Sequence, residues 1–207
     1  MKPLSIIFIL IFSFSVFCQT KTVKELEQQK KQYKNDKRYL VMFDKFEDQT
    51  IVRCIGFNLV SNMAGALSIM AAGRQGAQPT MIFLGAGFIF NGDTLKETAA
   101  DYFIIFDYSG EEWQFLKKSK LIALVDGERI QFGDGEAVRD VQRGGSVTEK
   151  IGFKVSREQL QKLSTAKTIE IKIGNYIKTL KSEYMDMFGN VLKLGDVSQK
   201  VESKKSK

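Results

Sequence analysis

The stretch MIFLGAGFIF, Met81–Phe90, and the stretch DYFIIFDY, Asp101–Tyr108, decide the fold class of this chain. Both are rich in aromatic and branched aliphatic residues, and a polar segment separates them, as is typical of neighbouring strands. Gly85 and Gly87 interrupt the first stretch and indicate a bulge or a close approach of two backbones. The sequence therefore predicts two β-strands here.

Strand-like patterns continue on both sides of these two stretches. Asp126-Gly127 predicts a tight hairpin turn. Ile169, Ile171 and Ile173 alternate with polar residues, which places all three on one buried face. The further predicted strands are Thr50–Val60, Glu112–Leu116, Lys120–Val125, Glu128–Phe132, Ser146–Val155, Thr168–Ile173 and Tyr176–Leu180.

Helical patterns are concentrated late in the chain. Ser156-Arg157-Glu158-Gln159 is a capping box that predicts a short helix as far as Ala166, and Ser182 is predicted to cap a last helix. Because few helical segments lie between strands, a parallel sheet is not expected. The predicted fold class is mainly β: an antiparallel β-sandwich or open barrel of about 7-8 strands, with one or two short helices packed at the C-terminal part.

Residues 1–18 predict a signal peptide, because Lys2 precedes an apolar run, Leu4–Phe17, that is short for a membrane span. We expect a Sec-type signal cleaved after Cys18, and therefore an exported protein in the periplasm, at the cell surface or secreted. The alternatives are a leader that is not cleaved and a lipidated Cys18. Bulky Phe17 disfavours lipidation, since lipoprotein signals carry a small residue before the cysteine.

The remaining chain divides into three parts by composition. Residues 19–38 are interpreted as a polar helical or flexible linker, residues 39–195 as the β domain, and residues 196–207 as a disordered basic tail. The formal net charge is +7, but residues 39–197 carry 19 basic and 20 acidic side chains, so the excess lies at the two ends. A nucleic-acid-binding domain carries its basic residues on the fold itself, so no nucleic-acid partner is expected.

The chain contains no histidine, and Cys54 is its only cysteine once the leader is removed. This composition excludes Ser-His and Cys-His catalytic pairs and predicts a buried, inert thiol at Cys54. Gly85-Ala86-Gly87 lacks the third glycine and the following helix of a dinucleotide fingerprint. We therefore predict no catalytic residue, no cofactor-binding residue and no cofactor.

Acidic residues do not change this expectation. Neither of two acidic sets has the spacing of a known site: the first does not match a calcium loop, and nothing places the second across one cleft as in glycosidases. The two sets are Asp134, Glu136 and Asp140, and Asp93, Glu97 and Asp101. We predict no metal site.

An apolar region extends from Cys54 to Gly92, where Arg74 is the only charged residue. A two-helix membrane hairpin is one interpretation. Asn58, Asn62 and Pro79 favour a core strand followed by a long loop, residues 61–78, instead. Loops of this length are often functional, so this loop is the expected contact with an unknown protein or surface ligand. The alternative is that it packs as a short helix on its own domain; membrane association is possible but not favoured.

The run Trp113–Lys181 resembles a class of uncharacterised exported bacterial β-sandwich proteins. In these proteins a strand ending in Asp-Gly-x-Arg, here residues 126–129, precedes a Ser-Arg-Glu-x-Leu helix, here residues 156–160. An Ala-x-x-(Ile/Val)-Glu strand, here residues 166–170, follows. The resemblance covers about a third of the chain and implies a fold without implying an activity. Trp113, the only tryptophan, is interpreted as a core residue of the sandwich rather than a ligand platform.

These observations predict an exported, non-enzymatic β-sandwich protein with a binding or structural role. Two alternatives stay open. The first is a membrane-attached protein, held by an uncleaved leader, a lipidated Cys18 or the region 54–92. The second is a hydrolase that uses carboxylates alone, which needs two buried acidic side chains within about 10 Å of each other.

Overall fold

The computed structural model describes residues 19–61, 81–115, 120–142 and 145–198. Within these ranges the chain is mainly β, with twelve strands in three antiparallel sheets and three α-helices, which confirms the predicted fold class. More strands are present than predicted. The two-residue strands β1 (Lys21–Thr22) and β5 (Thr94–Leu95) and the exposed strand β9 (Glu136–Val141) lack the apolar alternation by which a strand is recognised in sequence.

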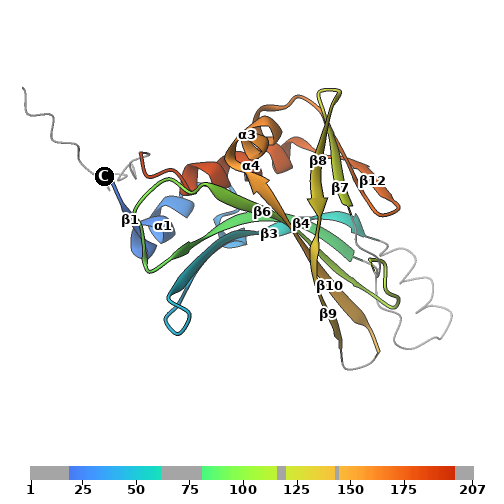
Figure 1. The fold of residues 1–207 in the computed structure, drawn as a ribbon, viewed down its shortest axis with the longest axis horizontal. Helices are drawn as coiled ribbons and strands as arrows, with labels where there is room; N and C mark the ends of the chain where they lie inside the picture. Colours follow the sequence, from blue (N-terminus) through green and yellow to red (C-terminus); the bar gives the residue numbers. More distant parts are fainter. Residues whose placement is uncertain (1–18, 62–80, 116–119, 143–144, 199–207) are drawn as a thin grey trace, which may run out of the picture.

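A six-stranded sheet forms the centre of the molecule (Figure 1). Its strands, in spatial order, are β2 (Tyr39–Asp44), β3 (Gln49–Ser61), β4 (Met81–Asn91), β6 (Asp101–Gly110), β10 (Val147–Ser156) and β9. The two stretches that dominate the sequence are therefore β4 and β6. They are direct antiparallel neighbours, with Ala86 opposite Ile104 and Leu84 opposite Phe106.

A smaller sheet of four strands packs beside the helices. Its order is β12 (Tyr176–Thr179), β11 (Ile169–Ile173), β7 (Lys120–Val125) and β8 (Glu128–Asp134). The predicted hairpin joins β7 to β8, and both turn residues have positive φ angles, 49° at Asp126 and 87° at Gly127. The three alternating isoleucines of β11 are all buried, as predicted.

The helices are α1 (Val23–Lys30), α3 (Arg157–Thr165) and α4 (Ser182–Leu194), with a 3₁₀ turn at Asp36–Arg38. The capping box of α3 is present as predicted, with the Ser156 hydroxyl accepting from the Gln159 amide. The predicted cap of α4 is wrong by one residue: Lys181 occupies the cap position without a side-chain hydrogen bond, and Ser182 is the first residue inside the helix.

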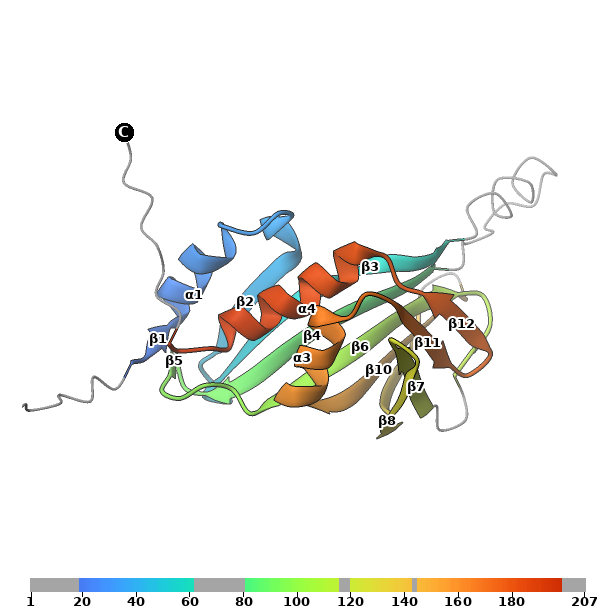
Figure 2. The same ribbon diagram turned by 90° about the horizontal axis from the view of Figure 1, so that it is seen from above.

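The core lies on one face of the six-stranded sheet. In Figures 1 and 2, α3, α4 and the small sheet all lie on this same face. A void of only about 10 Å³ remains where both sheets and both helices meet, so the interior is well filled. Its lining includes Leu84 and Phe106 from the large sheet, Ala123 and Ile171 from the small sheet, and Leu163 and Phe188 from the helices.

A buried carboxylate binds the segment of chain that leads from the large sheet to the small one. Glu149 of β10 has no exposed surface and accepts from the backbone amides of Gln114 and Phe115, at 2.6 and 3.0 Å. Arg139 of β9 donates to the same carboxylate at 3.3 Å and also to the Phe115 carbonyl. These bonds use the residues just before β7, and they explain why Glu112–Phe115 is irregular instead of forming the predicted strand.

The first described residues pack on the domain, whereas residues 19–38 had the composition of a linker. Leu26 of α1 is fully buried. The Lys21 ammonium group donates to the carbonyls of Lys193 and Leu194 at the end of α4, at 3.0 and 3.4 Å, and the Gln29 amide joins it at the Lys193 carbonyl. Burial lowers the pKa of Lys21 to about 8. A cation at a helix C-terminus binds carbonyls that lack partners within the helix. Lys21 therefore caps the C-terminal end of α4.

The start of the predicted tail is likewise ordered as far as it is described. Asp196 forms an ion pair with Arg157, 3.0 Å between side-chain atoms, and accepts from Ser198. The described ends of region 54–92 are strands β3 and β4, which pair with each other. Within the described ranges, no helix is long and apolar enough to cross a bilayer. The leader 1–18, most of the loop 61–78 and residues 199–207 lie outside the described residues.

Candidate functional site

The residues that the sequence singles out as candidates for catalysis or metal binding do not lie together in one site. Among the described residues, no group of three His, Cys, Asp or Glu side chains is placed to hold a metal ion. Cys54 is buried in β3, as predicted, and burial raises the pKa of its thiol to about 12, so it is a thiol rather than a thiolate at neutral pH. Trp113 is partly buried against the core.

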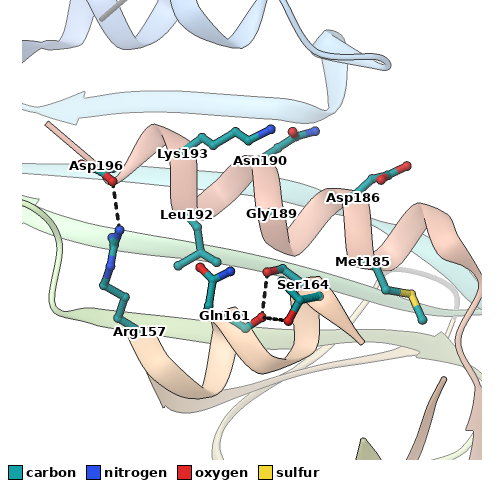
Figure 3. Close-up of a pocket in the computed structure, with 11 residues that line it drawn as sticks. Arg157, Gln161, Ser164, Met185, Asp186, Gly189, Asn190, Leu192, Lys193 and Asp196 are labelled. Atoms are coloured by element: carbon teal, nitrogen blue, oxygen red, sulfur yellow. Dashed lines mark hydrogen bonds and ion pairs between the residues drawn. The ribbon is translucent and has the colours of Figure 1, made fainter. Parts of the chain in front are cut away.

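A groove of about 410 Å³ lies between α3 and α4 (Figure 3). Arg157 of α3 reaches Asp196 at one end of it, and also donates to the Tyr102 hydroxyl at 3.2 Å. Burial alone raises the pKa of Asp196, but hydrogen bonds from Ser198 and the charge of Arg157 outweigh that effect and lower the pKa below its ordinary value. At this end of the groove, Arg157 and Asp196 therefore already bind each other as an ion pair.

The chemistry of the groove is that of a polar surface. The Ser164 hydroxyl donates to the Gln161 carbonyl of its own helix at 2.8 Å, and no imidazole is available to activate it. Asp186, Asn190 and Lys193 line the same groove from α4. These groups could hydrogen-bond a small polar molecule, but none of them forms a nucleophile paired with a base.

A larger candidate is the other face of the six-stranded sheet, which we call the open face. In Figure 1 no described element lies below it, opposite the helices. The strand register places a set of large apolar side chains there: Leu40, Met42, Ile51, Phe83, Ile89, Phe103, Ile105 and Val138. Met42 is 42% exposed, Ile89 44% and Val138 71%, whereas core residues on the covered face are below 10%. The other five are partly exposed. Apolar side chains gathered on an uncovered face favour an interaction site.

Two glycines of β4 shape the middle of the open face. A Cβ atom at Gly87 would lie 2.6 Å from the Phe103 ring and 2.3 Å from the Val52 carbonyl, and one at Gly85 would lie 2.5 Å from the Cys54 carbonyl. The absence of these side chains lets Phe103 and the neighbouring backbone approach β4 closely. The Gly85-Ala86-Gly87 motif is therefore explained by strand packing.

Two oppositely charged residues lie within this apolar surface. Asp107 of β6 and Arg53 of β3 each hold a buried polar atom, Oδ1 and Nε, with no hydrogen-bond partner in the described part of the chain. Burial raises the pKa of Asp107, although the charges of Lys150 and Arg53 oppose the rise. Lys150 of β10 is the cross-strand neighbour of Asp107. Polar atoms buried without partners cost free energy. The rest of each side chain is partly exposed, so both residues still present charge on the open face.

Arg53 and Asp107 are not among the residues for which the sequence predicts a role. A signal was present: Arg53 is the single charged residue in TIVRCIGF, and Asp107 interrupts the apolar interior of DYFIIFDY, which begins with Asp101. The strand period places Asp107 on the same side of β6 as Phe103 and Ile105. Its significance depends on that face being uncovered, which the sequence pattern does not indicate.

Comparisons with known proteins supply no further assignment. A scan of protein-family models and searches of curated proteins and of solved structures find no match to this chain.

Proposed function

We propose that this chain is an exported, non-enzymatic protein that works by binding, and that the open face of its six-stranded sheet is the binding surface. The observation that carries the proposal is a partly exposed apolar surface that contains two charged residues, Arg53 and Asp107, each with one buried polar atom that lacks a hydrogen-bond partner. A large apolar area gives an interface its driving force, and a few polar groups within it set orientation and specificity.

Three further observations support a binding role over catalysis. The chain contains no histidine, and Cys54 lies on the covered face, away from the open one. The groove between α3 and α4 holds a hydroxyl bonded to its own helix rather than to a base. The apolar leader that ends at Cys18 supports export, with Gln19 as the proposed first residue of the mature chain.

Site-specific photo-crosslinking in cells that export the chain tests this proposal. A photoreactive phenylalanine analogue replaces Ile89 on the open face in one variant and Ile177 on β12 in another. Ile177 is a matched control because it is also an exposed isoleucine on a strand, 59% exposed, but lies in the small sheet. We expect a crosslinked product from position 89 and none from position 177. Equal yields, or no product from position 89, would reject the open face as the binding surface.

A further inference from the structure

We infer that the partner of the open face is a second copy of this chain, bound face to face about a twofold axis. This inference rests on the proposed function, because it names the partner for the same surface. The charges on the open face, the positions of Arg53 and Asp107 and the area of the face support it.

The open face carries charges of both signs. The register places three basic side chains and five acidic ones on it: Arg53, Lys150 and Lys154, and Asp44, Asp101, Asp107, Glu136 and Asp140. Because basic and acidic groups are both present, such a surface can pair opposite charges with a copy of itself. It also lacks the excess of basic residues that attracts a protein to an anionic membrane surface.

Arg53 and Asp107 have opposite charges and are complementary to each other across a twofold axis. In a symmetric dimer, if residue i of one copy meets residue j of the other, residue j of the first also meets residue i of the second. An axis midway between Arg53 and Asp107 would bring Arg53 of each copy to Asp107 of the other. Both side chains are partly exposed, so a single arrangement would form two charge-assisted hydrogen bonds, each from an accessible N–H group of Arg53 to the Asp107 carboxylate of the other copy.

The area of the face fits a stable dimer. The six strands together contain 56 residues. At about 3.4 Å per residue and about 4.8 Å between strands, they span roughly 900 Å². A standard protein interface buries about 800 Å² on each partner. Sheets that stack face to face through apolar side chains are an established packing mode, about 10 Å apart.

The test reverses one charge at a time and measures the mass of the purified mature chain by sedimentation equilibrium. Wild type is expected at twice the chain mass. Arg53→Glu and Asp107→Lys should each weaken the dimer by at least about tenfold, because each places two like-charged pairs in the interface. Lys172→Glu, an exposed charge reversal on β11 in the small sheet, is the matched control and should leave the dimer unchanged.

Mixing the two single variants in equal amounts gives the decisive result. In a mixed pair, both contacts between positions 53 and 107 join opposite charges, so the two variants should dimerise with each other although neither does so alone. This rescue would also show that both variants are folded. A monomeric wild type, or a mixture that stays monomeric, would overturn the inference.

The crosslink at position 89 separates the failure of this inference from that of the proposed function. A product of twice the chain mass supports the dimer. A product of any other mass, together with a monomeric wild type, would overturn the dimer and leave the open face as a binding surface for another partner. An internal crosslink within one chain would overturn both.

Discussion

The two faces of the six-stranded sheet are made by alternate residues of the same strands, yet they differ in what covers them. Along β6, Ile104 and Phe106 are buried beneath the helices and the small sheet, while Phe103 and Ile105 lie on the open face. These four side chains are equally apolar, although Asp101 and Asp107 also lie on the open face of the strand. For these four residues, the difference in burial comes from which face the later elements α3, α4 and β11 cover.

Each face also contains buried charge, and the two cases differ. On the covered face, the Glu149 carboxylate has four hydrogen-bonding contacts with Gln114, Phe115 and Arg139. On the open face, Asp107 and Arg53 each keep a buried atom without a partner. A fully bonded buried carboxylate holds a fold together, whereas an incompletely bonded one is a candidate for binding. The comparison leads to three predictions about stability.

The largest expected effect is on the covered face. Phe106→Ala should lower the free energy of unfolding by about 3–5 kcal/mol, because it removes a fully buried ring that packs edge-on against Phe153, with centroids 5.9 Å apart. Ile105→Ala, one residue away on the open face, should cost only about 1 kcal/mol, because its side chain is already partly in water. Urea unfolding, at a concentration below any self-association, measures both. Similar costs would mean that the open face is covered within a single chain.

An intermediate effect is expected at the buried anchor. Glu149→Gln should cost about 2–3 kcal/mol, because one amide oxygen cannot replace both carboxylate oxygens toward the two backbone amides and Arg139. Calorimetric melting temperatures check this expectation. Glu170→Gln on β11, an exposed glutamate in the other sheet, is the control and should change stability by less than about 0.5 kcal/mol. An unchanged melting temperature for Glu149→Gln would show that the anchor contributes nothing to stability.

The smallest effect, and one of opposite sign, is expected at Asp107. Its pKa is raised in the folded chain, so the folded state binds the proton more tightly than the unfolded state, and stability falls as pH rises from the ordinary pKa of 3.8 through the raised value. Asp107→Asn removes this loss. The variant should match wild type at acidic pH and become slightly more stable than wild type at neutral pH, by much less than Glu149→Gln costs.

Urea midpoints of the dilute, monomeric chain between pH 3 and pH 7 measure this difference. A variant that becomes less stable than wild type as pH rises would mean that Asp107 has a stabilising partner inside its own chain. In that case the contrast between the two faces, and with it the proposal for the open face, would lose its main support.

Much of the local structure follows from the sequence because short-range physics determines it. The hairpin at Asp126-Gly127 needs two residues that tolerate positive φ, the capping box at Ser156 needs residues of fixed type three positions apart, and the isoleucines of β11 alternate with the strand period. The segment 112–115 was predicted wrongly, because its backbone amides bond to Glu149, more than thirty residues later.

The sequence by itself determined the β class, the positions of most strands, the late helices and the absence of histidine chemistry, since composition and residue periodicity contain that information. Only the tertiary structure decided that Lys21 caps the C-terminal end of α4, 172 residues away in the chain. It also decided that Asp107 lies on the uncovered face of the sheet, beside apolar residues that are not buried. Period-two alternation distinguishes the faces of a strand only when one of them is polar. In β4 neither face is polar, so which one remains open depends on where the helices dock.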